Sequence, residues 1–471
     1  MKKYLLFGAL VFSLSTPVFA QEQGNDYKAA VTTIIDKMEA EPNNPKAVKS
    51  LIKQYLKAFK KDEKALLALG NAYLSQRNYP EAKKVASLII NNKKLNGTCG
   101  YLLLGDIAAL EDSIGNAGAA AQQYQLAIES DPKNIDAYIR YAKIYRYIDF
   151  DVAINKLKEI RNYIPDYPIE PLAADIALSV GKYDVALNWY TQVDKSKLAE
   201  EDYYKYSFIA FTLQKYDKSI EVVKEGLSKY NNSEYIARVG MMAATAKGDY
   251  SDAIDYGKLV FAGKGTKVAN DYAIYGKALY GNKQFDEALK SLNKALEIDK
   301  KNFEPMKTIA DVYAAQGDDD KALEIQKDYL SKNPNANSND WSKLAQTYVD
   351  KAIKITDTTA KNATLDKAIA VYEEMISKFP SISDWIWLNQ ATAAYAKNDP
   401  DLVAKIYNKI AAYEEAKSSL TADDKQYLEQ VYYGLGYYHS KKGNKELANE
   451  YFKKVLSINP DNQNAKNALG K

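Results

Sequence analysis

The stretch YYGLGYYHSKKGNKELANEYFKKVLSINP, residues 432–460, decides the fold of this chain. Apolar and small residues recur at helical spacing in its first half, and again in its second half after a break at Gly443. Pro460 ends the second run, because proline cannot continue a helix. The residues that carry this pattern are Tyr432, Leu435, Gly436, Ala448, Phe452 and Val455. The stretch therefore predicts two amphipathic helices joined by a tight turn.

Similar spacing recurs upstream about every 34 residues. Clear copies begin at Leu66, Tyr101, Tyr138, Tyr272, Met306 and Trp341, weaker ones lie near Ala173, Tyr203 and Ala237, and a further copy begins at Trp385. The pattern W-x2-L-G-x2-Y, then A-x3-F, then P, resembles the tetratricopeptide repeat, with Tyr or Leu often in the place of the first Trp. The resemblance implies an all-α, right-handed superhelical solenoid, whose concave face is lined by the first helix of each pair.

The repeat also predicts how the chain is divided. We expect an N-terminal partial repeat over residues 21–62, an array of about ten units over 63–415, a polar connection over 416–428, a last repeat over 429–462 and a short tail over 463–471. An insertion near residues 354–365 is rich in Thr and Asp, and either projects as a loop or extends a helix. Because the tail is short for a capping helix, we expect the last unit to meet a partner or a second copy.

The first 20 residues are typical of a secretory signal peptide. Lys2 and Lys3 precede an apolar run over residues 4–14, and the segment ends on the small residue Ala20. The run is too short to span a bilayer, and Gln21 stands where a bacterial lipoprotein would have Cys. We therefore expect a periplasmic or secreted protein with no membrane span once the leader is removed.

Composition excludes several classes of function. The net charge is +3 with acids and bases interleaved, whereas a nucleic-acid partner normally leaves a basic stripe. The chain has one cysteine, Cys99, and one histidine, His439, so it offers no disulfide, no zinc ligand set and no Ser-His-Asp arrangement. We expect no enzyme, no catalytic residue, no cofactor and no metal.

Two local features have structural explanations. His439 falls where Tyr73, Tyr145, Tyr313, Tyr348 and Tyr395 fall in other repeats, which predicts a packing role. The acids of residues 318–320 lack the spaced ligands of a calcium loop and are expected to begin a helix.

Binding is the function that the sequence favours. In the tetratricopeptide family, ligand-facing residues lie one step after the large and small signature residues of the first helix. The resemblance gives as groove candidates Tyr204, Phe208, Phe211, Tyr235, Arg238 and Met242, and as secondary candidates Lys143, Arg146, Tyr433 and Tyr437. The alternative is that these irregular repeats pack differently and turn the same side chains inward.

A clamp for a peptide carboxylate, which some family members form from Lys and Asn one turn apart, is not supported. Asn71 is paired with Leu67 at the Lys position, and Lys307 is paired with Asp311 at the Asn position. The leading hypothesis is a scaffold that binds a protein or peptide in its concave groove. The alternative is a non-catalytic binder of cell-envelope or dietary polysaccharide, suggested by the 39 tyrosines.

Overall fold

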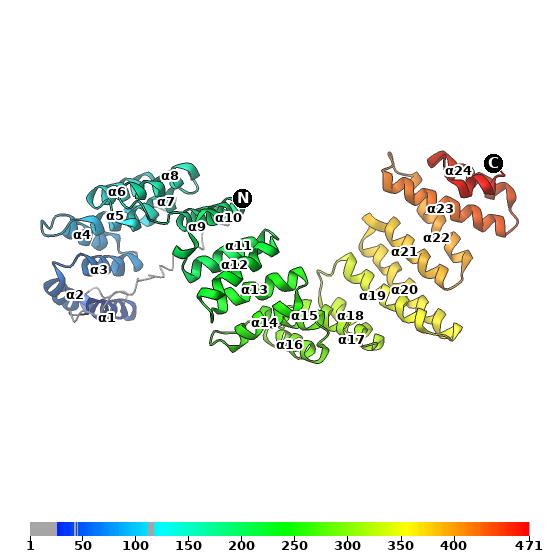
Figure 1. The fold of residues 1–471 in the computed structure, drawn as a ribbon, viewed down its shortest axis with the longest axis horizontal. Helices are drawn as coiled ribbons and strands as arrows, with labels where there is room; N and C mark the ends of the chain where they lie inside the picture. The colour runs from blue at the N-terminus through cyan, green and yellow to red at the C-terminus, as the bar shows by residue number, and fades with distance from the viewer. Residues whose placement is uncertain (1–25, 42–43, 45, 112–116, 471) are drawn as a thin grey trace. The chain divides into compact units, whose positions relative to one another are not determined.

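The computed structural model describes residues 26–41, 44, 46–111 and 117–470, and within these ranges it contains helices and connections but no strand. Contacts divide the chain into two compact units, one ending at Asp202 and the other beginning at Tyr203. In each unit, consecutive helices pack in pairs (Figure 1). The predicted all-α solenoid of helix pairs is therefore confirmed. The predicted leader, residues 1–20, lies outside the described residues.

The described residues of the first unit form ten α-helices and two short 3-10 helices. They are α1 (Tyr27–Ala40), α2 (Lys46–Phe59), α3 (Glu63–Ser75), α4 (Tyr79–Ile90), α5 (Thr98–Glu111), α6 (Ala117–Ser130), α7 (Ile135–Tyr145), α8 (Phe150–Lys158), η1 (Glu159–Asn162), α9 (Glu170–Ser179), α10 (Tyr183–Gln192) and η2 (Lys195–Lys197).

The second unit holds the remaining helices, the first of which begins three residues before the boundary. They are α11 (Glu200–Thr212), α12 (Tyr216–Lys229), α13 (Glu234–Lys247), α14 (Tyr250–Ala262), α15 (Ala269–Gly281), α16 (Phe285–Ile298), α17 (Glu304–Ala315), α18 (Asp319–Lys332), α19 (Ser338–Lys354), α20 (Thr358–Lys378), η3 (Pro380–Ile382), α21 (Ser383–Ala396), α22 (Pro400–Glu415), α23 (Ala422–Lys441), α24 (Lys445–Ile458) and α25 (Gln463–Ala468).

Local sequence sets the helix ends. The carboxylate of Asp62 accepts a hydrogen bond of 3.0 Å from the N–H of Ala65 and so caps α3. Between α23 and α24 the chain turns at Gly443, whose φ of +82° lies in the left-handed region that glycine adopts without a steric penalty. The break predicted inside residues 432–460 is this turn.

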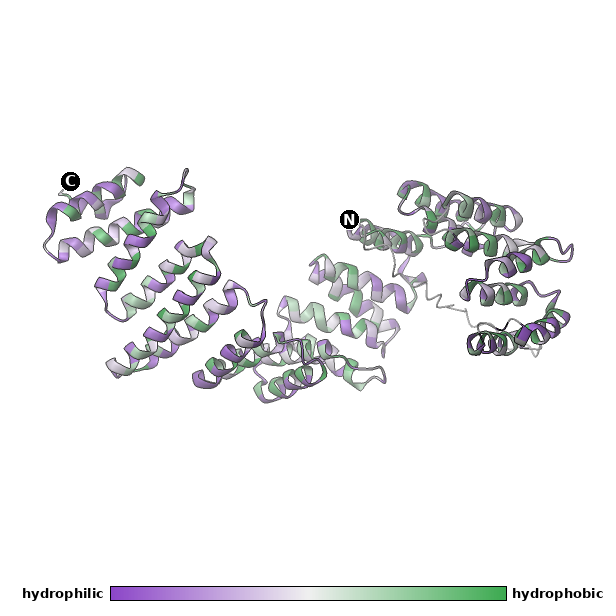
Figure 2. Ribbon diagram, turned by 180° about the vertical axis from the view of Figure 1, so that it is seen from behind, coloured by the Kyte–Doolittle hydropathy of each residue, from purple (hydrophilic) through white to green (hydrophobic). Residues whose placement is uncertain are grey.

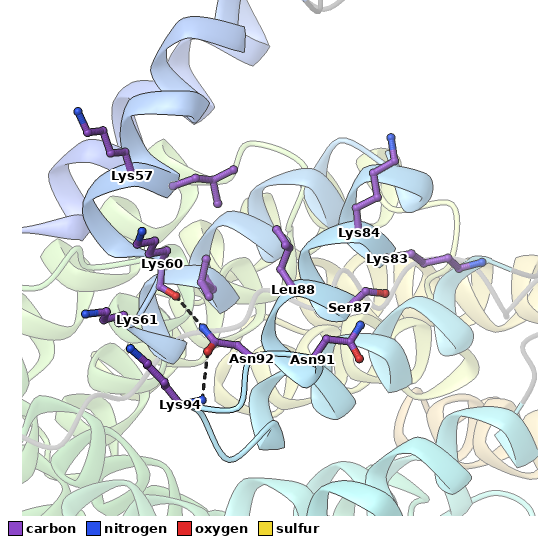
Figure 3. A pocket seen from close by; sticks show the side chains of 12 residues that line it. Lys57, Lys60, Lys61, Lys83, Lys84, Ser87, Leu88, Asn91, Asn92 and Lys94 are labelled. Atoms are coloured by element: carbon purple, nitrogen blue, oxygen red, sulfur yellow. Dashed lines mark hydrogen bonds between the residues drawn. The ribbon is translucent and has the colours of Figure 1, made fainter.

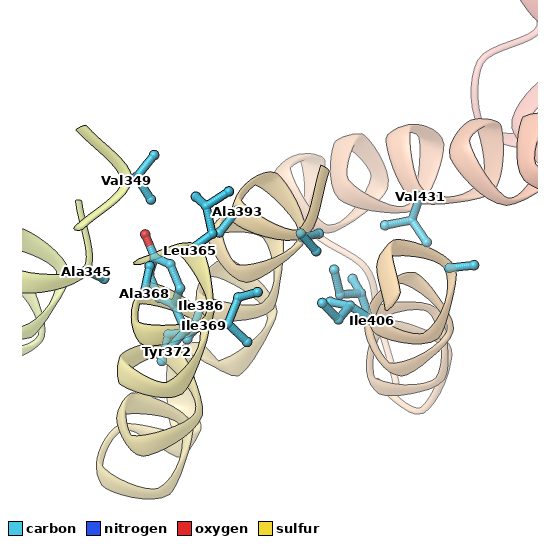
Figure 4. Packing of buried hydrophobic residues seen from close by; sticks show 14 of the residues in the cluster. Ala345, Val349, Leu365, Ala368, Ile369, Tyr372, Ile386, Ala393, Ile406 and Val431 are labelled. Atoms are coloured by element: carbon cyan, nitrogen blue, oxygen red, sulfur yellow. The ribbon is translucent and has the colours of Figure 1, made fainter. Parts of the chain in front are cut away.

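The core of each unit lies between paired helices. Hydrophobic and hydrophilic residues alternate around the helices (Figure 2), and the apolar ones pack between neighbours, as the close view of α19–α23 shows (Figure 4). Leu435, Phe452 and Val455 are buried, as the spacing predicts. A Cβ on Gly436 would lie 2.7 Å from the ring of Phe452, so α23 and α24 approach closely only because this position has no side chain.

The insertion takes one of its two predicted forms, and the boundaries differ from the predicted ones in two other places. The insertion near 354–365 lengthens α19 and α20, and the carboxylate of Asp357 caps α20 by accepting from the N–H of Ala360 at 2.7 Å. The polar connection covers only residues 416–421, because Thr421 caps α23 in a capping box with Asp424. The tail forms α25, in which Ala465 is buried, and Leu469 packs on the core beyond it.

Among the described residues before 63, α1 and α2 form a pair of helices, and α1 also packs on α3. Among the described helices, none is both long enough and apolar enough to cross a bilayer.

Candidate functional site

Five aromatic side chains form a continuous row in the second unit, which we call the aromatic row. In order they are Tyr235, Tyr204, Phe208, Phe211 and Tyr216, with neighbouring ring centroids 6.1, 5.9, 6.4 and 6.0 Å apart. The three rings on α11 are spaced at i, i+4 and i+7, which places them on one face of the helix. Tyr235 begins the row on α13, and Tyr216 ends it at the start of α12 (Figure 1).

The opposite face of α11 is buried and fixes the row. Ser207 and Ser219 are fully buried, and the Oγ of Ser219 donates a hydrogen bond of 2.9 Å to the carbonyl oxygen of Ser207. Small side chains at this contact let α11 and α12 approach closely. The row is therefore carried by a helix that is packed along its other side.

Helix α13 is buried on most of its surface. A Cβ on Gly240 would lie 2.8 Å from Val223 and 2.9 Å from the ring of Tyr256, so α13 is packed tightly from two sides. Of the groove candidates on this helix, Tyr235 is 63% exposed, whereas Arg238 and Met242 are half-buried.

Arg238 is held by the next repeat. Its Nε lies 2.7 Å from Oδ1 of Asp271, and its Nη2 lies 3.2 Å from Oδ2. Asp271 is only 1% exposed and also accepts a hydrogen bond from the N–H of Val268 at the start of α15. The guanidinium thus neutralises a buried carboxylate and joins α13 to α15, which is a structural role.

A second ion pair stabilises the backbone beside Tyr235. The carboxylate of Glu234 lies 2.7 Å from Nζ of Lys267 and accepts the N–H of Gly265 at 2.8 Å. The hydrogen bond from Lys267 lowers the pKa of Glu234. The ammonium of Lys267 also donates to the carbonyl oxygens of Gly263 and Gly265, so the loop after α14 is tied to the start of α13.

The aromatic row offers apolar contact area with two polar hydroxyl groups at one end and one at the other. None of its rings is fully buried, and Phe208 is 37% exposed. All six groove candidates are thus at least partly exposed, and Arg238 is occupied by its ion pair. In the aromatic row no acid, base or nucleophile points toward a common position. The arrangement therefore offers a surface for binding.

The secondary candidates lie elsewhere. Lys143 is exposed, whereas Arg146 folds back, donates to the carbonyl oxygen of Lys143 and lies 4.7 Å from the ring centre of Tyr147. In the last repeat, Tyr433 packs 5.8 Å from Phe452, and Tyr437 is exposed.

The tyrosines that align with His439 in other repeats are packed in some of those repeats but not in all of them. His439 stacks on Tyr451 at 5.6 Å with an interplanar angle of 4°, as a packing residue would. Tyr348 is buried, but Tyr395 is 79% exposed. The prediction for Tyr395 was wrong, because Ala391 and Ala394 take the buried positions of α21 and shift the register by one residue.

The acids of residues 318–320 begin α18, as predicted. Asp318 caps the helix by accepting the N–H of Lys321 at 3.0 Å. Asp319 pairs with Lys354 at 2.8 Å, and Asp320 pairs with Lys351.

Sequence reasoning missed one cluster of acids. Asp384, Glu414 and Asp424 converge, and the ammonium of Lys417 lies 3.5, 2.7 and 2.6 Å from them respectively. Hydrogen bonding to Lys417 holds the pKa of Asp424 well below its usual range. A lysine side chain therefore supplies the positive charge that this cluster requires.

It also missed Tyr216 as the end of the row. A signal was present, because the first residue of the second helix is aromatic in many pairs. These residues are Tyr79, Phe150, Tyr183, Tyr216, Tyr250 and Phe285.

Comparison with known families gives two matches, both described as tetratricopeptide repeat. One covers residues 279–346 and the other residues 429–462, which run from within α23 to just past the end of α24. A TPR repeat-containing protein of Methanocaldococcus jannaschii is 22% identical over 339 residues, which are 64% of this chain and 58% of that protein. The chain thus spans less than two thirds of that relative.

Solved structures give similar matches. The C-terminal part of a TPR repeat-containing protein from Cytophaga hutchinsonii is 21% identical, with a TM-score of 0.46, over 56% of this chain and 99% of that one. A MamA fragment from Desulfovibrio magneticus RS-1 is 17% identical, with a TM-score of 0.32, over 35% of this chain and 92% of that one. With the sequence matches and the helix pairs taken together, the chain contains tetratricopeptide repeats and is a helical repeat scaffold.

Proposed function

We propose that this chain is an exported scaffold that binds a protein or peptide partner through the aromatic row. The observation that carries the proposal is the row itself, in which five rings from three consecutive helices stand side by side and two of them are well exposed. Contiguous apolar surface of this kind is unfavourable in water, and aromatic side chains dominate the binding energy of many protein interfaces.

A peptide suits the row better than a polysaccharide does. A sugar ring stacks flat on one exposed aromatic face, and a run of sugars calls for several such faces with a common orientation. The rings of the row are instead inclined to their neighbours by 23°, 66°, 38° and 44°. Inclined rings leave notches that apolar side chains fill, so a peptide is the proposed occupant and a glycan is the alternative.

Export is proposed from the leader-like residues at the start of the chain. Lys2 and Lys3, the apolar run and Ala20 match the three regions of a secretory signal peptide. We accordingly place the scaffold in the periplasm or outside the cell, without catalytic activity of its own.

The experiment is a comparative capture from a cell-envelope extract, with proteins and glycans analysed by mass spectrometry. The bait proteins are the wild type, Phe208→Ala with Tyr235→Ala, and the control Tyr395→Ala, which removes a tyrosine that is still more exposed than Tyr235 from another helix of the same unit. A protein that the wild type and the control retain, and the double variant loses, supports the proposal. Enrichment of glycan alone, or equal capture by all three baits, contradicts it.

A further inference from the structure

A large basic hollow lies in the first unit, between α2 and α4, and it shares no residue with the aromatic row. Its volume is about 1160 Å³, and we call it the lysine trough (Figure 3). The trough arises because α2 packs chiefly on α1 and touches α3 only lightly. Pockets for small molecules are typically about 300–1,000 Å³, so this one is large enough for a segment of polypeptide.

The floor of the trough is apolar. Leu56 comes from α2, Leu66 from α3 and Leu88 from α4. Leu88 is 51% exposed, although it lies in the last turn of α4 beside the buried Ile89. An apolar partner side chain would remove this surface from water.

The rim is basic. It carries Lys57, Lys60, Lys61, Lys83, Lys84 and Lys94, and no acid is among the lining residues. Lys83 pairs with Glu111 at 2.7 Å and Lys84 pairs with Glu81, whereas the other four lysines make no ion pair within the described ranges. Like charges this close repel one another, and a bound anion would relieve that repulsion.

One end of the trough is fixed before any ligand arrives. The side-chain amide of Asn92 donates to the carbonyl oxygen of Lys60 at 3.0 Å and accepts the N–H of Lys94 at 3.1 Å (Figure 3). This residue thus ties the loop after α4 to the chain after α2. A site that is ordered in advance loses less entropy on binding.

We propose that the lysine trough binds an acidic amphipathic segment of a partner protein, with its apolar side chains on the three leucines and its carboxylates on the lysine rim. The lining has no aromatic residue on which a nucleic-acid base would stack, and the apolar floor would be left empty by a bare phosphate chain. Because the trough and the aromatic row share no residue, a negative result for one proposal leaves the other unaffected.

The probe is a fluorescein-labelled helical peptide with leucines at i, i+4 and i+7 and glutamates elsewhere, titrated with the full chain and followed by fluorescence anisotropy. The trough variant is Lys57→Glu with Lys60→Glu and Lys61→Glu. The matched control is Lys46→Glu with Lys49→Glu and Lys133→Glu, which reverses three exposed lysines of the same unit that neither line the trough nor lie within one helical turn of a lining lysine.

We expect the trough variant to weaken binding by about tenfold or more, because reversing rim charges replaces attraction by repulsion. The control variant should change the affinity by less than about twofold, in keeping with distant surface charges at physiological salt. Leu88→Ser in the chain, or serine for leucine in the probe, should also weaken binding. Circular dichroism checks that every variant keeps its helices.

Three results would overturn the proposal. They are no binding of the probe to the wild type, equal losses in the trough and control variants, and tighter trough-dependent binding of oligothymidine or of phosphatidylglycerol vesicles than of the peptide.

Discussion

Replacing Glu414 with glutamine is expected to abolish most of the pH dependence of stability of the second unit near neutral pH. Glu414 lies on α22, is fully buried, and faces the ammonium of Lys417 together with Asp384 and Asp424. Burial raises the pKa of Glu414 to about 7, against the hydrogen bond from Lys417, which lowers it.

The sign of the effect follows from proton binding. An unfolded glutamate has a pKa of about 4.3, so between about pH 4.5 and 7 the folded chain retains a proton that the unfolded chain has released. The free energy of unfolding therefore falls as the pH rises through this window. A pKa that rises from about 4.3 to about 7 on folding corresponds to ~4 kcal/mol. For a unit of this size that is a melting shift of roughly 6–10 °C.

Asp424 acts outside this window. Its pKa is held below the usual range by Lys417, so its stabilisation is present above about pH 4 and is lost only in more acidic solution. The change of the free energy of unfolding with pH near neutrality is therefore assigned to Glu414.

Calorimetry of the wild type and Glu414→Gln at several pH values between about 5 and 8 measures the effect. The wild type should melt at a lower temperature as the pH rises, and the variant should not. Glu415→Gln is the control, because the hydrogen bond from Lys454 lowers the pKa of Glu415 and keeps it out of the window. A wild-type melting temperature that is flat or rises with pH, or an unchanged slope in Glu414→Gln, would refute the reasoning.

Three further predictions concern the packing of the repeats, and urea unfolding measures each. Arg238→Ala leaves the buried Asp271 without its partner and should cost roughly 3–5 kcal/mol, of which adding Asp271→Asn recovers a part; no recovery would mean that the two residues act independently. Gly240→Ala places a Cβ 2.8 Å from a valine methyl group and should cost about 1–3 kcal/mol, whereas an unchanged midpoint would show that α13 moves freely. Tyr124→Phe removes the hydroxyl that donates to the buried Asp106 at 2.8 Å and should cost about 1–3 kcal/mol; a neutral effect would indicate that Arg140 alone satisfies this carboxylate.

Much of the fold was predictable because the repeat pattern is itself the packing pattern. The small and large positions of residues 432–460 are the buried positions of α23 and α24, and the turn falls at the glycine. The boundaries were less predictable. Polar residues near 354–365 extend α19 and α20, since helix ends that project past their neighbours need no apolar face.

The predicted register of buried positions was wrong in α21, where several signature residues of the repeat are replaced together. In α21 an alanine stands where other repeats have a tyrosine, so the next aromatic residue, Tyr395, was assigned to the packed face although it is exposed. A pattern based on residue size cannot distinguish two registers that differ by one step when most candidates are small.

Phe208 was named because it lies one step after the signature residue Ser207, and Tyr235 because it shares a helix face with Arg238 and Met242; both are exposed. The role of Arg238 was not predicted, because its partner is 33 residues away, one repeat further along the chain. Similar pairs join Arg140 to Asp106 and Lys307 to Asp340, 34 and 33 residues apart. A search for opposite charges one repeat apart would have found them. The lysine trough depends on how α2 lies against α4, which residue spacing does not specify.

Site-specific photo-crosslinking tests the central claim most directly. A benzoylphenylalanine placed at position 235 lies in the aromatic row, and one placed at position 395 lies at an exposed tyrosine outside it. The account predicts that, in an envelope extract, position 235 gives a discrete crosslinked protein and position 395 gives none. Crosslinking of the same protein from both positions, or no protein crosslink at position 235, would contradict it.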